Sequence, residues 1–144
     1  MWVSDWEYGL PLAVATMVFH VAAFMLITRA LVPEVAAHRK GPFRFIVGVG
    51  LLAVAAAVLH GMEGLAWAQL YVWLGALPDF RTAVLYSLGA MTSYGHADIY
   101  LEPRWMLLGT IEAINGLILF GLTTAFFFAA IQKAWPPPSS TDQL

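Results

Sequence analysis

Three long runs of the chain carry almost no charged side chains, and this feature constrains the fold more than any other. The runs extend from Tyr8 to Thr28, from Phe45 to about Leu77 and from Trp105 to Gln132. About 20 predominantly apolar residues suffice for a helix to cross the hydrocarbon core of a bilayer. With 60% hydrophobic and 11% charged residues, the chain has the composition of an integral membrane protein. We therefore expect an all-α fold with three transmembrane helices.

A fourth apolar run, from Phe80 to Met91, is too short to cross the membrane. As a helix it would measure about 18 Å, against about 30 Å of hydrocarbon. A polar segment from Thr92 to Asp98 follows it, and backbone of this kind cannot face lipid because its N–H and C=O groups would lack partners. The pattern predicts a re-entrant helix followed by a loop that lines water or packs against protein.

The composition also excludes several classes of function. A chain of 144 residues that spends about half its length on spans leaves no room for a separate soluble catalytic domain. The absence of cysteine excludes disulfides, thiolate metal sites and cysteine nucleophiles. A net charge of −2 without a basic stripe argues against nucleic acid as a partner. We recognise no catalytic group and no nucleotide-binding motif, so we expect neither an enzyme nor a bound cofactor or metal.

The basic residues predict how the chain is oriented in the membrane. Most of them follow the first span or the last one, namely Arg29, Arg39, Lys40, Arg44 and Lys133. Positively charged loops stay on the cytoplasmic side, so the N-terminus is expected outside the cell membrane and the C-terminus in the cytoplasm. The predicted regions are 1–42 for the N-terminal span and cytoplasmic loop, 43–135 for the pore-forming part, and 136–144 for a proline-rich disordered tail.

A half-length helix, a polar loop and a glycine-containing span together form the physical arrangement of a cation filter. Backbone carbonyls of such a loop replace the water that an ion sheds, and the negative end of the helix dipole stabilises the cation. One chain supplies only one loop, so a closed ring needs several copies about an axis. We expect a homotetramer in membrane lipid that passes monovalent cations such as K⁺ or Na⁺ without energy input.

The residues of this region resemble the pore domain of the potassium-channel superfamily. Residues 83–99 are similar to its pore helix and filter, and residues 116–125 to its inner helix. The segments 59–63 and 104–109, with Glu112 and Asn115, are similar to small bacterial ion-channel proteins that have an extra N-terminal span. The resemblance implies a tetrameric pore with three transmembrane helices, a re-entrant pore helix and a filter loop in each subunit.

The filter differs from the superfamily pattern of threonine, a hydrophobic residue, glycine, tyrosine, glycine and aspartate. Ser93, Gly95 and Asp98 match or nearly match that pattern, whereas His96 replaces the tyrosine and Ala97 the second glycine. Alanine disfavours the left-handed backbone, and histidine titrates near neutral pH. We expect weakened or altered potassium selectivity that depends on external pH. The expected ion-filter residues are Thr92, Ser93, Tyr94, Gly95, His96, Ala97 and Asp98.

Two further sets of residues are candidates outside the filter. Gly116, Gly121 and Thr124 on the last span are expected to line the pore or act as a gating hinge, although small residues also permit simple close helix contacts. Glu112 is an acidic residue inside a span, where a charge is costly and marks a functional site. We interpret Glu112, together with Glu63, as support for the filter from behind.

Two alternative interpretations remain. A filter that has collapsed would leave a non-conducting membrane subunit with a structural or regulatory role. In the other, His60 and Glu63 share a helix face at i, i+3 and combine with His20 and Glu112 into a histidine–carboxylate metal site. The paired Glu-x-x-His motifs of di-iron helical bundles are missing, which argues against this second alternative.

Overall fold

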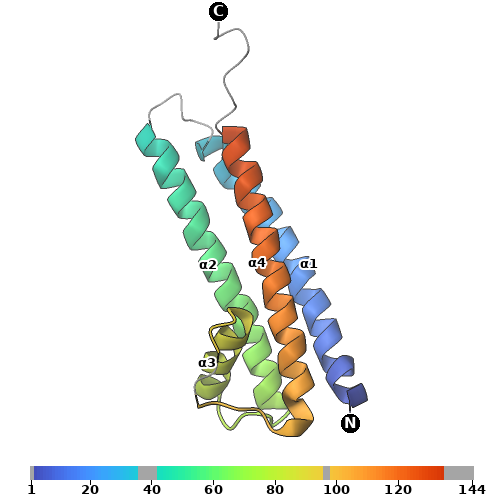
Figure 1. Cartoon of the computed structure of the whole chain (residues 1–144). Coiled ribbons are helices and arrows are strands. Elements are labelled where there is room, and N and C mark those ends of the chain that lie inside the picture. Colours follow the sequence, from blue (N-terminus) through green and yellow to red (C-terminus); the bar gives the residue numbers. More distant parts are fainter. Residues whose placement is uncertain (1, 36–41, 96–97, 135–144) are drawn as a thin grey trace, which may run out of the picture.

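The computed structural model describes residues 2–35, 42–95 and 98–134, and within these ranges it is helical with no strand. Four α-helices follow one another, α1 (Trp2–Val35), α2 (Pro42–Trp73), α3 (Phe80–Met91) and α4 (Met106–Ala134), and the short 3-10 helix η2 (Pro103–Trp105) precedes α4 (Figure 1). The proline-rich tail at 136–144 lies outside the described residues.

The three long helices confirm the prediction of three helices that are long and apolar enough to span a membrane. Segments long and apolar enough to cross a membrane run over Ser4–Ala30, Phe45–Trp73 and Pro103–Lys133. The helices α1 and α4 run in the same direction and α2 runs opposite to them, and α1 packs against both of its neighbours (Figure 1).

The second helix ends earlier than the apolar run predicts, at Trp73 instead of about Leu77. Gly75 adopts the left-handed conformation (φ 64°) that commonly terminates helices. The backbone N–H of Ala76 then donates to the carbonyl of Tyr71 at 2.9 Å. Ala76 and Leu77 remain buried, which explains why the hydrophobic run outlasts the helix.

The short helix α3 packs against α2 and α4 and lies at the end of the bundle where α1 begins (Figure 1). After α3 the chain returns to that same end before α4 starts (Figure 1). The expected twelve-residue helix is therefore present, with the expected bounds Phe80–Met91.

Buried side chains form two apolar clusters separated by a polar layer. The larger cluster lies near α3 and includes Trp67, Tyr71 and Leu108, whereas the smaller one includes Phe24 and Leu59. Between them, near the middle of each long helix, lie four polar residues: His20, His60, Glu63 and Thr123.

Candidate functional site

The helix α3 begins at a strong N-cap. Asp79 has an extended backbone, and its Oδ2 accepts from the Thr82 hydroxyl at 2.6 Å while its Oδ1 accepts from the Thr82 backbone N–H at 2.9 Å. These hydrogen bonds to Thr82 hold the pKa of the Asp79 carboxyl below its usual range because they favour the ionised form. Asp79 thus satisfies a free N–H group of the first turn and sets the start of α3.

Ser87 connects the middle of α3 to both neighbouring helices. Its hydroxyl lies 2.9 Å from the carbonyl oxygen of Gly64 in α2 and makes a short hydrogen bond with Oε1 of Glu112 in α4. The hydroxyl of Tyr71 donates to Oε2 of Glu112 at 2.6 Å. Ser87, Tyr71 and Glu112 are all fully buried.

The number of available protons indicates the protonation state of Glu112. The single hydroxyl hydrogen of Ser87 cannot serve two acceptors fully. Every group is satisfied when Ser87 donates to Gly64 and Glu112, as a neutral acid, donates to Ser87. A neutral carboxyl also avoids the cost of a charge inside a membrane span. We therefore assign Glu112 as a neutral acid that links α3 to α4.

The C-terminal end of α3 touches the backbone of α4 directly. A Cβ atom built on Gly116 would lie 2.5 Å from the carbonyl oxygen of Met91 and 2.6 Å from its Cα. About two turns earlier, Gly109 leaves room for the hydroxyl of Tyr86. Gly116 is therefore a close-contact residue that positions Met91, the last residue before the polar loop.

The loop after α3 has an unusual backbone. Thr92 caps the helix, and its hydroxyl donates to the carbonyl of Leu88 at 2.6 Å. Ser93 has a φ of 56° and Gly95 a φ of 92°, so left-handed residues occur two positions apart. Serine rarely adopts this conformation, and such strain is characteristic of functional sites.

The same loop is exposed on the surface of the single chain. Thr92, Ser93, Tyr94 and Gly95 are exposed, with Tyr94 90% exposed. A groove of about 480 Å³ lies beside the loop and is lined by Leu85, Leu88, Gly89, Thr92, Tyr94, Gly95 and Ile99. Asp98 is also exposed. The expected filter residues His96 and Ala97 lie outside the described residues.

The remaining predicted residues lie apart from the loop. Gly121 and Thr124 are exposed on α4, and a Cβ on Gly121 would meet nothing within 4 Å. The hydroxyl of Thr124 donates to the carbonyl of Phe120 in its own helix at 2.9 Å. Glu63, expected to support the filter, contacts two histidines, and it is the neighbouring Gly64 that accepts from α3.

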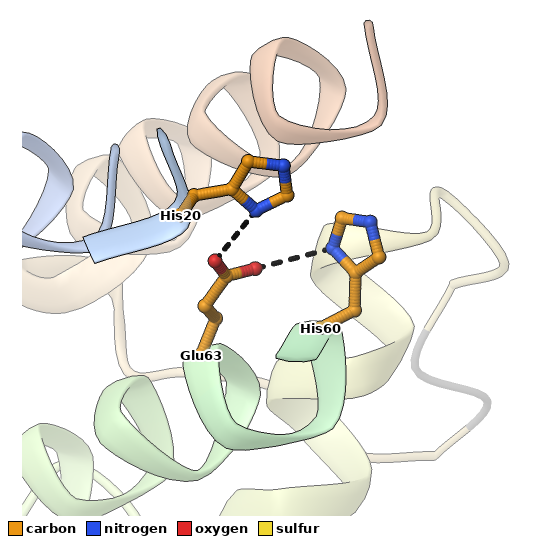
Figure 2. Close-up of side chains that lie close together, drawn as sticks. All are labelled: His20, His60 and Glu63. Atoms are coloured by element: carbon orange, nitrogen blue, oxygen red, sulfur yellow. Dashed lines mark hydrogen bonds and ion pairs between the residues drawn. The ribbon is translucent and has the colours of Figure 1, made fainter. Parts of the chain in front are cut away.

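Those histidines come from two helices and face one carboxylate. Nδ1 of His20 lies 2.8 Å from Oε1 of Glu63, and Nδ1 of His60 lies 3.2 Å from Oε2 (Figure 2). His20 and Glu63 are buried, and the side chain of His60 is 11% exposed. Of the four residues that the sequence suggested for a metal site, three meet here, whereas Glu112 belongs to the contact with Ser87.

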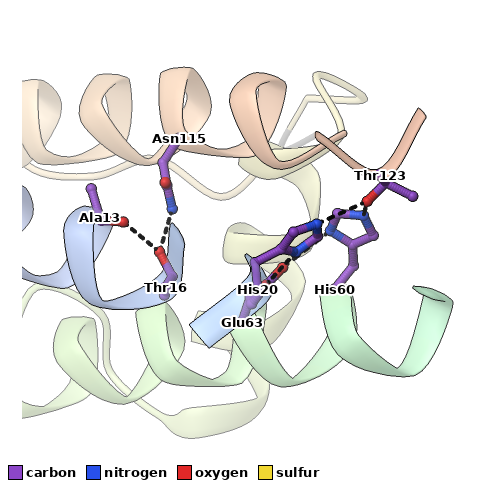
Figure 3. A network of polar contacts seen from close by, with 7 residues as sticks. All are labelled: Ala13, Thr16, His20, His60, Glu63, Asn115 and Thr123. Atoms are coloured by element: carbon purple, nitrogen blue, oxygen red, sulfur yellow. Dashed lines mark hydrogen bonds and ion pairs between the residues drawn. The ribbon is translucent and has the colours of Figure 1, made fainter. Parts of the chain in front are cut away.

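Thr123 of α4 contacts the opposite edges of both imidazole rings. Its Oγ1 lies 2.9 Å from Nε2 of His60 and 3.1 Å from Nε2 of His20 (Figure 3). Nearby, the amide of Asn115 donates to the hydroxyl of Thr16 at 2.9 Å and forms a second polar link between α4 and α1 (Figure 3).

Sequence reasoning missed the partners of these acidic residues. No motif in the sequence marks the positions of Tyr71 and Thr123. The contact between Ser87 and Glu112 could have been predicted, because Glu112 needs a polar partner inside the membrane and Ser87 is a polar residue on the short helix.

Comparison with models of known protein families, with curated proteins and with solved structures finds no match. The resemblance to potassium channels therefore depends on the residues of this chain alone.

Proposed function

We propose that four copies of this chain form a passive cation channel with potassium-channel-like architecture. In this assembly, α3 and the loop from Thr92 to Asp98 enter the membrane from the outer side, and the loops surround a shared axis. The chain carries no catalytic role, and its partners are its own copies, membrane lipid and the permeant cation.

The observation that carries this proposal is the backbone of the loop. Ser93 and Gly95 are left-handed, and Tyr94 between them is not. When left- and right-handed residues alternate, successive carbonyl oxygens turn toward the same side of the chain, and this is how carbonyls replace the hydration shell of an ion. The strained φ of Ser93 has a functional explanation in this role.

The exposure of the loop supports an assembly of several copies. The residues that precede His96 have no cover from their own chain, and the adjacent groove is lined mostly by apolar side chains. An open, apolar-lined surface of this kind suits contact with a neighbouring subunit. A ring of four copies would cover the groove and bring four loops to one axis.

Charge supports the proposed orientation. The ends of the long helices away from α3 (Figure 1), together with the stretch of sequence that joins α1 to α2, carry five of the seven basic residues, namely Arg29, Arg39, Lys40, Arg44 and Lys133. The other two, Arg81 and Arg104, belong to α3 and η2. With the ends away from α3 in the cytoplasm, the C-terminal end of α3 points toward the membrane centre. Its negative dipole end then faces the place where a cation loses water.

Two glycines provide a matched test of the loop. Gly75 and Gly95 both have positive φ, and a Cβ at either position would meet nothing within 4 Å. Alanine therefore costs about 1 to 2 kcal/mol of backbone strain at each position. In liposomes, we expect Gly95→Ala to lower K⁺ flux or change the K⁺/Na⁺ ratio, and Gly75→Ala to leave both unchanged.

The wild-type chain supplies the other outcomes. We expect K⁺ and Na⁺ to pass at comparable rates and the ratio to change between external pH 5.5 and 8, through His96. Strict potassium selectivity at both pH values would refute the altered filter. A folded, reconstituted chain without flux of either ion would refute the channel and favour the non-conducting alternative.

A further inference from the structure

A buried cluster between the two apolar cores has ligands for a metal ion. His20 on α1 and His60 and Glu63 on α2 each offer a ligand atom, and these atoms all lie within 4.8 Å of one another. The three residues are well removed from the polar loop along the chain, and the channel proposal uses neither His20 nor His60. Two imidazoles and a carboxylate are a ligand set that Zn²⁺ takes in proteins.

Two buried atoms of the cluster have no hydrogen-bond partner. Nδ1 of His60 and Oε2 of Glu63 are both buried without a hydrogen bond, although they face each other at 3.2 Å (Figure 2). A buried polar atom without a hydrogen bond destabilises the folded chain. An ion between the Nδ1 atoms and the carboxylate would supply a partner to both.

The number of protons around Thr123 points in the same direction. If both histidines are neutral and donate from Nδ1 to Glu63, both Nε2 atoms present lone pairs to one hydroxyl, whose single hydrogen serves only one of them. If a metal binds both Nδ1 atoms, both Nε2 atoms carry hydrogen and donate to the two lone pairs of Thr123. The distances of 2.9 and 3.1 Å fit this second arrangement.

We propose that His20, His60 and Glu63 bind one Zn²⁺ ion, and that Thr123 orients both histidines from the opposite side. Both oxygens of Glu63 face the histidines, so the carboxylate can complete a four-coordinate site. A group that accepts the second N–H of a ligating histidine fixes the orientation of the ring, and the Thr123 hydroxyl is placed to accept from both rings.

The surroundings accommodate the charge of the ion. Zn²⁺ and the Glu63 carboxylate together leave one positive charge. The ring of Phe120 stacks on His60 with centroids 4.2 Å apart, and Phe24 lies against His20 at 4.9 Å. Aromatic faces attract positive charge, and most strongly where water is absent. The ion would cross-link α1 to α2 near the middle of both helices and so stabilise the packing of the N-terminal helix against the rest of the bundle.

The test measures zinc binding to the full chain in detergent, purified with a tag that contains no histidine. After removal of metal with a chelator and reloading with Zn²⁺, elemental analysis should find one ion per chain. Co²⁺ in its place should give the visible absorption of a tetrahedral site. Glu63→Gln keeps the size of the side chain and should abolish both signals.

Two adjacent threonines provide the matched comparison. Thr123→Val should weaken zinc binding about 10- to 100-fold, because both histidines lose their shared acceptor. Thr124→Val removes a hydroxyl that bonds only within its own helix and should leave zinc binding unchanged. Ion flux plays no part in these measurements, so their outcome is independent of whether the chain conducts.

Two results would overturn the proposal. One is a folded wild-type chain that retains no zinc. This result would mean that an additional proton on one histidine, and not an ion, holds the two histidines and the Glu63 carboxylate together. The other is equal zinc retention by the wild type and Glu63→Gln, which would place the ion on other residues such as His38.

Discussion

Substitution of Gly116 by alanine should weaken the packing of α3 against α4. The new Cβ would meet the backbone of Met91 at 2.5 and 2.6 Å, and backbone atoms cannot rotate away. To restore carbon–carbon separations of about 3.5 Å, the end of α3 must move by about 1 Å. Overpacking of this kind costs about 1 to 3 kcal/mol.

Gly121 on the same helix is the matched control. A Cβ there meets nothing within 4 Å, so Gly121→Ala keeps only the gain of about 0.5 to 1 kcal/mol from replacing a helical glycine. The two variants should therefore differ in stability by about 2 kcal/mol, or about 4 to 8 °C in Tm. Thermal unfolding in detergent, followed by tryptophan fluorescence, measures this difference.

The ion-flux assay adds a second readout to the same pair. Because Met91 directly precedes Thr92, Gly116→Ala should also change the K⁺/Na⁺ flux ratio of reconstituted protein, whereas Gly121→Ala, which lies apart from the loop, should leave that ratio unchanged. Equal melting temperatures for the two variants would show that α3 does not press on α4 at Gly116 and would refute the close contact.

Two further predictions concern the polar groups that hold α3. Glu112→Gln should unfold in detergent at nearly the wild-type temperature, since a neutral amide can accept from Tyr71 and donate to Ser87. Glu112→Leu leaves both hydroxyls without that partner and should lower the unfolding temperature. Equal destabilisation by both substitutions would contradict a neutral Glu112. Because the pKa of Asp79 is lowered, its contribution to folding stability is complete above the ordinary carboxyl pKa and is lost as pH falls through the lower pKa of the folded state. Asp79→Asn still caps the helix, so this variant should lose less thermal stability than the wild type below about pH 4. An unchanged pH profile in Asp79→Asn would assign the acid sensitivity to other carboxyls.

The long helices and α3 could be predicted because their determinants are local. Spans follow from length and apolar composition, and α3 follows from Pro78 and Asp79 before it and the polar residues after Met91. The end of α2 was misplaced because the hydrophobic run continues through Leu77. Gly75 adopts a left-handed conformation and ends the helix although the apolar run continues, and this glycine is the sequence feature that predicts the helix end.

The polar clusters could not be predicted to the same extent, because they depend on the rotation of each helix about its axis. In a helix that is apolar on every side, no amphipathic stripe indicates the inner face. His20 and Glu63 lie 43 residues apart, and nothing in their spacing indicates that they meet. Glu112 could be recognised as a buried acid, but its partners Ser87 and Tyr71 required the packing of α3 between α2 and α4.

Three of the contacts of α3 on α4 fall at positions 109, 112 and 116, which lie along one face of that helix. Each position is matched to one residue of α3, namely Tyr86, Ser87 or Met91. Substitutions at these sites should consequently occur in pairs. A related sequence with a larger residue in place of Gly109 should also lack the tyrosine at 86, while exposed positions such as 114 and 117 vary independently.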